Sequence, residues 1–505
     1  MTAVSPGASQ ASAASQARAP AQRVPFVTKL FYASGSIGNA IKKGGLASFL
    51  LLYYNQVVGL PAAKVATALG VALIVDAVLD PLVGYWSDNV RSRWGRRHPF
   101  MYASILPVSI GFVLLWMAPE GWSDLHLTIY MVTLVFVIRV FDTFFEVPAA
   151  ALLAELTTDY EQRTAIISMR FIFGISGAFG MRMLAYSVLL VPTAADVSGV
   201  LNREGFQKYG IIGGMIIFLA ILGCCLGTHN QIRHLHRPPV RRPGFMDFLR
   251  QVVAIFRNRS MLAAVGGGIL LALGAGAVSG LNIYIVAYVF GLKSSQIAIL
   301  VPIDLAGSVL GALAAMHIAR WLGKRNGAIL ALFTSYVGLA VPLLAFVLEI
   351  APPRGSTEVL YLLGAAGFVG DFGRVAFSTL MSSMMLDLVE DMQLKNGGRS
   401  EGLLLSADNV LQKAVAGLGI ISSGLILAFA GFPDNAKPGK VAEGPLDALA
   451  ATVAFGLAPV YLLAAICLLG YRLTKSQHEA NVANLGNQRP QAPQDDPDGS
   501  RRPAT

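Results

Sequence analysis

The stretch DPLVGYWSDNVRSRWGRRHP, residues 80–99, joins the end of a long apolar run to a short turn that is rich in arginine. The apolar run begins near residue 63 and is long enough to cross a bilayer core of about 30 Å as one helix. The turn carries four arginines, Arg91, Arg93, Arg96 and Arg97. Because Lys and Arg gather in the cytoplasmic loops of membrane proteins, the stretch predicts a membrane-spanning helix that ends at the cytoplasmic face.

The composition of the whole chain agrees with this interpretation. Of the 505 residues, 54% are hydrophobic and only 13% are charged, which is too little polar surface to cover a soluble protein of this size. The formal net charge of +10 comes from Lys and Arg in the connectors between apolar runs, so it indicates membrane topology rather than a nucleic-acid partner. We therefore expect a polytopic α-helical membrane protein.

Apolar stretches of spanning length fall into two groups of six, which gives about twelve helices. The first group is expected near 28–56, 63–87, 99–118, 126–154, 163–192 and 209–229. The second group is expected near 260–290, 296–320, 326–350, 357–388, 402–431 and 446–473. Basic connectors alternate with connectors poor in arginine, as the positive-inside rule requires.

The domain organisation follows from these groups. A basic cytoplasmic linker, 230–259, separates an N-terminal six-helix half, 25–229, from a C-terminal six-helix half, 260–475. The polar segments 1–24 and 476–505 are expected to be disordered cytoplasmic tails. Two six-helix halves joined by a basic loop is the plan of the major facilitator fold, with a twelve-helix protein of another fold as the alternative.

The opening stretch also resembles the signature of a known family. Gly84, Asp88 and the arginine-rich turn resemble the loop 2–3 signature of the major facilitator superfamily, in the form used by the glycoside-pentoside-hexuronide:cation symporters, the melibiose permease family. The second half continues the resemblance at Asp387, Glu390, Lys395, Gly398, Arg399, Gly402 and Lys413. The resemblance spans nearly all of the membrane region. It implies symport of a sugar, glycoside or sugar acid with a cation, by alternating access of the two halves.

Two carboxylates of the second helix form the candidate cation site. Asp76 and Asp80 are four residues apart, which places them on one face about one turn apart, near the bilayer centre. Because intramembrane charges are costly, the pair either binds a cation or serves as a structural partner for intramembrane Lys or Arg. The resemblance implies that both bind the coupling cation and that Thr143 and Lys413 lie beside them. A lysine there can keep the carboxylates ionised until a cation arrives, or it can form a static salt bridge between the halves.

The candidate substrate contacts come partly from the resemblance. It assigns the family's sugar-binding arginine to Arg170 and its sugar-binding aspartate to Glu146, which keeps the carboxylate. The family's helix 1 aspartate corresponds to Ala40, however, and this departure puts galactoside-type recognition in doubt.

Cations near these positions suggest a different solute. We hypothesise that Lys43, Arg170 and Arg139 recognise an anionic solute such as a uronate or its glycoside, because cationic donors pair well with carboxylates. The alternative is internal pairing of these cations with Asp142 or Glu146.

The same opening stretch predicts a cytoplasmic gate made of Gly84, Asp88, Arg91, Arg96 and Arg97. A carboxylate at the helix end can pair with the loop arginines in one conformation and release them in another. The alternative is that these arginines only fix the topology.

Other functional classes find less support. The sequence has no phosphate-binding loop for ATP and no grouping of nucleophile, base and orienting residue, so we expect no enzyme activity, no metal site and no cofactor apart from the coupling ion, H⁺ or Na⁺. The expected partners are a small polar solute and the bilayer of a cytoplasmic (inner or plasma) membrane, without nucleic acid or an obligate protein partner. Two alternatives are a sodium-coupled carrier of lysophospholipids or other amphiphiles, as in an animal branch resembling this family, and a non-transporting solute receptor on the same fold.

Overall fold

The computed structural model is an all-helical bundle, and it describes residues 24–90, 92–157, 159–194, 196–232, 259–396 and 401–471. The first half forms α1 (Phe26–Ser48), α2 (Leu50–Leu52), η1 (Tyr53–Val58), α3 (Ala62–Asn89), α4 (His98–Leu115), α5 (Asp124–Leu156), α6 (Tyr160–Leu184), η2 (Ala185–Leu189) and α7 (Arg203–His229). The second half forms α9 (Arg259–Tyr284), η4 (Ile285–Val289), α10 (Ser294–Val347), α11 (Thr357–Asn396), α12 (Glu401–Phe429) and α13 (Glu443–Leu469). The prediction of an all-α membrane protein with about twelve spans is confirmed, because the described helices make six crossings in each half when α10 is divided at its kink.

The kink in α10 lies at Gly323, whose φ of 76° and ψ of 160° are not helical. A positive φ is accessible to glycine without the clash that a side chain would make, so the chain turns within one residue. The sequence predicts two helices here with a connector of several residues, 321–325. The structure shows both helices but reduces the connector to this single residue.

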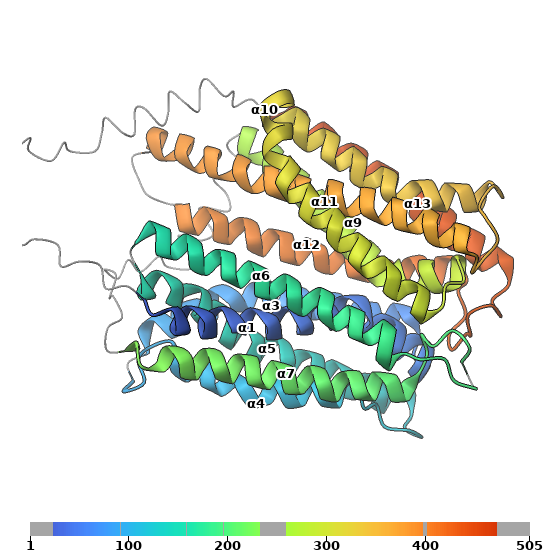
Figure 1. Ribbon diagram of the computed structural model, residues 1–505, viewed down its shortest axis with the longest axis horizontal. Coiled ribbons are helices and arrows are strands. Elements are labelled where there is room, and N and C mark those ends of the chain that lie inside the picture. The colour runs from blue at the N-terminus through green and yellow to red at the C-terminus, as the bar shows by residue number, and fades with distance from the viewer. Residues whose placement is uncertain are drawn as a thin grey trace, which may run out of the picture.

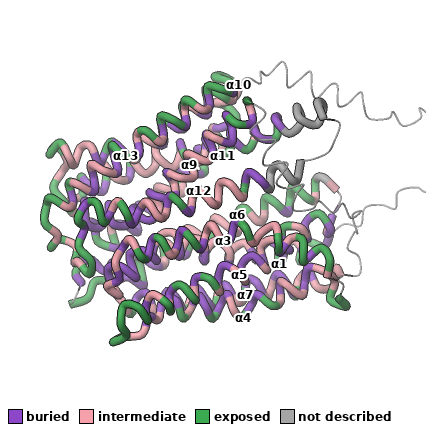
Figure 2. Tube along the Cα trace, turned by 180° about the vertical axis from the view of Figure 1, so that it is seen from behind, coloured by how far each residue is buried: buried purple, intermediate pink, exposed green. Residues whose placement is uncertain are grey.

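The outer surface of the bundle is apolar along the length of its helices. Ten helices among the described residues are long and apolar enough to cross a membrane. Large apolar side chains are exposed on several of them, including Ile110, Leu219, Leu313 and Phe333, and Figure 2 shows exposed residues along the outer helix faces from end to end. Such an extensive apolar exterior fits lipid rather than water.

The two halves form separate groups of helices that meet along α3 and α12 (Figure 1). The contact is close because both helices have small residues there. A Cβ on Gly417 would lie 2.6 Å from the carbonyl oxygen of Gly70, and a Cβ on Gly424 would lie 2.7 Å from that of Ala62. Glycine at these positions lets the two backbones touch, as in other membrane helix pairs.

Hydrogen bonds join the halves at the end of the bundle that carries η1. Asn55 donates to the Asp434 carboxylate at 2.6 Å, and Gln56 donates to the Pro433 carbonyl at 3.1 Å and accepts from the Ala436 N–H at 2.6 Å. The side chains of Asn55 and Gln56 are buried. We name these contacts the latch and this end of the bundle the latch end.

Several predicted segments lie outside the described residues. They are the tails 1–24 and 476–505, apart from Val24, and the linker 230–259, apart from 230–232 and Arg259. The boundaries of the tails, linker and halves therefore stay predictions.

Candidate functional site

The two predicted cation-binding carboxylates lie on one face of α3. Asp76 is buried, whereas Asp80, one turn further on, is partly exposed. Pro81 follows inside the helix, and because proline has no N–H, the carbonyl of Ala77 lacks its helical hydrogen bond.

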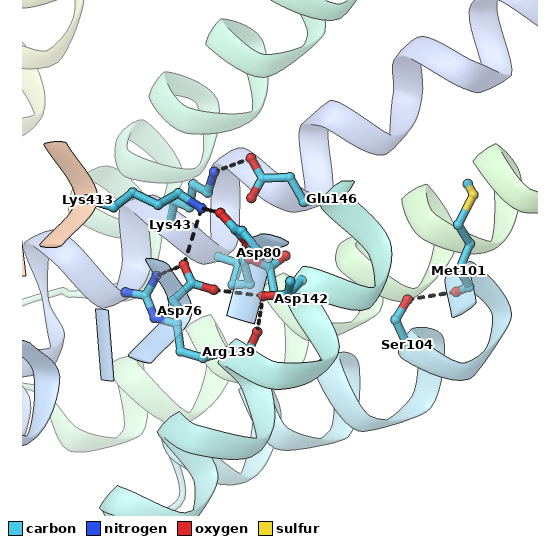
Figure 3. A network of polar contacts seen from close by, with 11 residues as sticks. Lys43, Asp76, Asp80, Met101, Ser104, Arg139, Asp142, Glu146 and Lys413 are labelled. Atoms are coloured by element: carbon cyan, nitrogen blue, oxygen red, sulfur yellow. Dashed lines mark hydrogen bonds and ion pairs between the residues drawn. The ribbon is translucent and has the colours of Figure 1, made fainter. Parts of the chain in front are cut away.

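Asp76 is held by side chains of α5 and α12 (Figure 3). The Thr143 hydroxyl donates to its Oδ1 at 2.8 Å, and Thr143 is as fully buried as Asp76. The other oxygen, Oδ2, lies 3.6 Å from Nη1 of Arg139 and 3.5 Å from Nζ of Lys413. A buried carboxylate is thus compensated by one hydroxyl and two cations.

Asp80 forms the shortest of the ion pairs that Lys413 makes. Nζ of Lys413 lies 2.5 Å from Asp80 Oδ2, and 25% of the lysine side chain remains exposed. Lys413 belongs to α12 and the carboxylates belong to α3, so the ammonium ties the two halves together. The structure therefore brings together all four residues of the predicted cation site.

This arrangement presents the oxygens that hard cations bind. Two carboxylates and a hydroxyl suit Na⁺, and either carboxylate can take a proton. In the structure, the ammonium of Lys413 already compensates the same carboxylates. A cation bound between the two carboxylates would have to compete with Lys413 for Asp80.

The neighbouring cations of α1 and α5 pair in a specific pattern. Lys42 forms a buried ion pair with Asp142, and Nζ of Lys43 lies 2.7 Å from Oε1 of Glu146. Arg139 pairs with Asp76 on α3. It does not pair with Asp142, although the spacing of three residues between Arg139 and Asp142 places them on one face of α5. Internal pairing is therefore present for Lys43, while 41% of its side chain and 26% of that of Glu146 remain exposed.

Arg170 of α6 is held differently from the other cations. Its Nε donates to the Ser36 hydroxyl at 3.3 Å and its Nη1 to the Tyr32 hydroxyl at 3.2 Å, and its guanidinium lies over the Tyr32 ring. No carboxylate pairs with Arg170 among the described residues. A small cavity of about 10 Å³ lies between Arg170 and Glu146, also lined by Asn39.

The charges of this region do not balance. The cluster of cations is Lys42, Lys43, Arg139, Arg170 and Lys413. The carboxylates facing them are Asp76, Asp80, Asp142 and Glu146. One positive charge is in excess, and Arg170 is the cation that carries it.

The predicted gate residues form a cluster within the first half. Arg97 pairs with Asp88, and its Nε lies 3.0 Å from Oε1 of Glu155 at the end of α5. Arg96 Nη2 lies 2.9 Å from the same oxygen. At Gly84 a Cβ would make only an ordinary contact, 3.5 Å from a Val147 methyl, so packing does not require glycine there.

Arg91, the remaining predicted gate residue, lies outside the described residues. Sequence reasoning also missed two partners of Arg97, namely Glu155 and the Ser87 hydroxyl, which accepts from Nη1 at 2.7 Å. The sequence signal that could have identified Glu155 is its position as a carboxylate at the end of an apolar span. The arginine-rich turn between α3 and α4 needs such acidic partners.

A bundle of two six-helix halves, with an ion-paired cluster buried where they meet, defines a multi-pass membrane transporter and not an enzyme. The chain belongs to the MFS/sugar transport protein family, which matches residues 31–475. The resemblance to the glycoside-pentoside-hexuronide:cation symporters is confirmed, because curated relatives are named as symporters and carriers of that kind.

Three relatives illustrate the similarity. An uncharacterized symporter of Synechocystis sp. is 26% identical, over 91% of this chain and 96% of the relative. The isoprimeverose transporter of Lactiplantibacillus pentosus is 23% identical, over 90% of each chain. The glucuronide carrier protein homolog of Escherichia coli K12 is 23% identical, over 93% of this chain and 97% of the relative.

Solved structures confirm the major facilitator fold. A bacterial homologue of the human lysosomal transporter Spinster, inward-facing and unoccupied, has a TM-score of 0.61 at 15% identity, over 89% of this chain and 98% of that one. A bacterial homologue of the peptide transporters PepT1 and PepT2 has a TM-score of 0.59 at 13% identity, over 92% of this chain and 98% of that one.

Proposed function

We propose that the protein is a symporter that couples inward movement of a sugar, glycoside or sugar acid to H⁺ or Na⁺ by alternating access of its two halves. The observation that carries the proposal is the contact of Lys413 on α12 with Asp76 and Asp80 on α3. One ammonium from the second half occupies the carboxylate pair of the first half. No cofactor other than the coupling ion is part of the proposal.

Coupling follows from competition for these carboxylates. A cation that binds Asp76 and Asp80 releases Lys413, and this removes an ion pair between the halves. A charge-assisted hydrogen bond contributes about 1.5–3 kcal/mol net. Loss of the Lys413 ion pair when a cation binds is therefore large enough to shift the equilibrium between two conformations of the transporter. The bound ion thereby biases which side of the transporter is open.

The excess positive charge favours an anionic solute. Arg170 has no carboxylate partner among the described residues, and a bound coupling ion adds a second excess charge to the cluster. A carboxylate on the solute would compensate one of them. The name of the glucuronide carrier homolog agrees with a sugar acid, whereas that of the isoprimeverose transporter agrees with a neutral glycoside.

The orientation in the membrane is part of the same proposal. The basic turn between α3 and α4 lies at the end of the bundle opposite to the latch, and by the positive-inside rule this end is cytoplasmic. We therefore propose that both termini lie in the cytoplasm and that the latch closes the extracellular side. The cluster of Asp88, Arg96, Arg97 and Glu155 would exchange partners when the cytoplasmic side closes.

The experiment is solute-driven ion uptake into proteoliposomes, with methyl β-D-glucuronide and methyl β-D-glucoside tested separately with H⁺ and with Na⁺. We expect glucuronide to drive uptake of one ion in the wild type and Asp76→Asn to abolish it. The matched control is Asp408→Asn on α12, a buried carboxylate that accepts a hydrogen bond from Gln412 of its own helix and that an amide can replace. Absence of ion movement with either solute, in protein that folds normally, would refute sugar symport.

A further inference from the structure

A second cavity, of about 460 Å³, lies in the part of the bundle nearer to the latch. Helices α9, α10 and α11 of the second half form most of its wall, and further residues come from α1, α6 and η2 of the first half and from η4 and α13 of the second. Residues central to its chemistry are Phe179, Arg182, Asn282, Asp304, Asp371 and Arg374. Its volume lies within the range of about 300–1,000 Å³ that is typical of small-molecule sites.

Two ion pairs supply the charges of this cavity. Arg182 Nη2 lies 2.9 Å from Asp304 Oδ2, and this pair joins α6 of one half to α10 of the other. On α11, Arg374 contacts Asp371 Oδ1 through Nη2 at 2.8 Å and Nε at 2.9 Å. Each carboxylate thus uses one of its two oxygens, and 45% of the Arg374 side chain is exposed.

Further polar and apolar groups complete the lining. Asn282 of α9 is exposed, and its amide has no hydrogen-bond partner in the described part of the chain. Phe179, Tyr186 and Phe290 contribute aromatic rings. A few convergent polar groups in a mostly apolar wall is the usual constitution of a ligand site.

The wall of the cavity is rigid because α10 and α11 touch through their backbones. A Cβ on Gly307 would lie 2.5 Å from the Phe368 carbonyl oxygen. A Cβ on Gly367 would lie 2.7 Å from Oδ1 of Asp304, so the glycine makes room for this carboxylate. Such close packing holds the charged groups in fixed positions.

This cavity is separate from the cluster around Arg170. Arg170 and Arg182 both belong to α6 and are twelve residues apart, which corresponds to about 18 Å along the helix axis. One sugar ring cannot contact both guanidinium groups.

We propose that this cavity is a second solute site, which binds an uncharged sugar. Its two guanidinium groups and two carboxylates cancel in charge, so it has no excess charge to attract an anion, in contrast to the cluster around Arg170. Sugar hydroxyls can donate to the remaining carboxylate oxygens and accept from guanidinium N–H groups, while a ring face packs on the aromatic side chains. The inference rests on the proposed function, because it takes a sugar as the solute class.

The position of the site also gives it a place in the transport cycle. The Arg182–Asp304 pair crosses between the halves, so separation of the halves at the latch end breaks it and leaves both groups to a solute. The site is then the first one that a solute meets when it enters from the latch end.

The test is equilibrium dialysis of the purified protein in lipid nanodiscs with radiolabelled methyl β-D-glucoside and methyl β-D-glucuronide, two probes that differ only at C6. The first variant is the double substitution Asp371→Asn and Arg374→Gln, which leaves the net charge unchanged. We expect glucoside affinity to fall by about tenfold or more, as for the loss of one or two hydrogen bonds to charged groups, and glucuronide affinity to change less than about threefold. Arg170→Gln should lower glucuronide affinity more than glucoside affinity.

A second variant protects the test against misfolding. Asn282→Leu removes an exposed amide without breaking a contact of the described residues, and it should also weaken glucoside binding. The proposal is overturned if the wild type does not bind glucoside, or if glucoside affinity is equal in the wild type and in Asn282→Leu. Ion-driven uptake is measured separately, so loss of symport with intact glucoside binding would refute the proposed function and leave this site standing.

Discussion

Replacement of Lys413 by methionine is the most informative perturbation of the candidate cation site. Methionine keeps most of the length and apolar volume of the side chain but removes the ammonium. Nζ of Lys413 lies 2.5 Å from Asp80 and 3.5 Å from Asp76, so the substitution removes the group that competes with the coupling cation.

The size of the effect follows from these contacts. A hydrogen bond between charged groups contributes about 1.5–3 kcal/mol net, and each 1.4 kcal/mol corresponds to a factor of ten in affinity. If the cation must displace Lys413, the lysine lowers the apparent affinity by roughly 10- to 150-fold. We therefore expect Lys413→Met to bind the coupling cation more tightly by that factor. Solute-driven transport should nevertheless slow, because binding of the ion no longer displaces an ion pair that joins the two halves.

The assay is calorimetric titration of the purified protein with NaCl at constant ionic strength, together with proton uptake after a pH step in weak buffer. Lys43→Met is the matched control, because Lys43 also pairs with one carboxylate in the membrane, Glu146, at 2.7 Å. The control should leave cation affinity within about threefold. An unchanged or weaker cation affinity in Lys413→Met would show that the lysine does not compete with the ion, and the coupling argument would fail.

Three further predictions concern this site and the contacts between the two halves. Thr143→Val removes the hydroxyl 2.8 Å from the buried α3 carboxylate and should lower cation affinity by about 5- to 30-fold, whereas Thr143→Ser should preserve it in the same titration. Gly70→Val places a side chain against the backbone of Gly417 and should reduce transport by more than about tenfold; normal transport would mean that α3 and α12 need not touch. Asn55→Leu removes the hydrogen bond to Asp434 and should raise solvent accessibility at the latch end, measured by hydrogen exchange of the backbone amides of residues 434–436; unchanged exchange would refute the latch.

Apolar runs alone predict most ends of the spans to within about four residues, but α7 begins at Arg203 and not near 209, and α11 ends at Asn396 and not near 388. Each run of spanning length is expected to form a helix, because in lipid a helix satisfies the backbone hydrogen bonds within the segment itself. The junction of 296–320 with 326–350 shows the limit of this argument. A connector of several residues is expected there, and the chain instead turns at Gly323 alone, because one residue with positive φ suffices to interrupt a helix.

Ion-pair partners are harder to predict than helices. Periodicity places a residue on a face of its own helix but does not show which face of another helix it meets. Arg139 and Asp142 share a face of α5 and are an obvious pair, yet they bind Asp76 and Lys42 on other helices. A buried charge takes the partner that compensates it best, and that partner depends on helix packing.

The second cavity shows a related limit. Arg182 and Asp304 are 122 residues apart and meet only because α6 packs against α10. The sequence signal was present, since each is a charge within an apolar run and such charges need partners. Only the packing of the two halves shows that they belong together.

In the proposed cycle, the balance of charge opposes movement of the coupling cation without the solute. With no ion bound, the cluster around Asp76 has one excess positive charge, carried by Arg170. A coupling cation raises the excess to two, and an anionic solute returns it to one. Closure of the cytoplasmic side would remove water from this region and raise the free-energy cost of every uncompensated charge. In the proposed cycle, the transporter therefore reorients more readily empty or with cation and anion together than with the cation alone. This difference keeps the cation from crossing efficiently without the anionic solute, as symport requires.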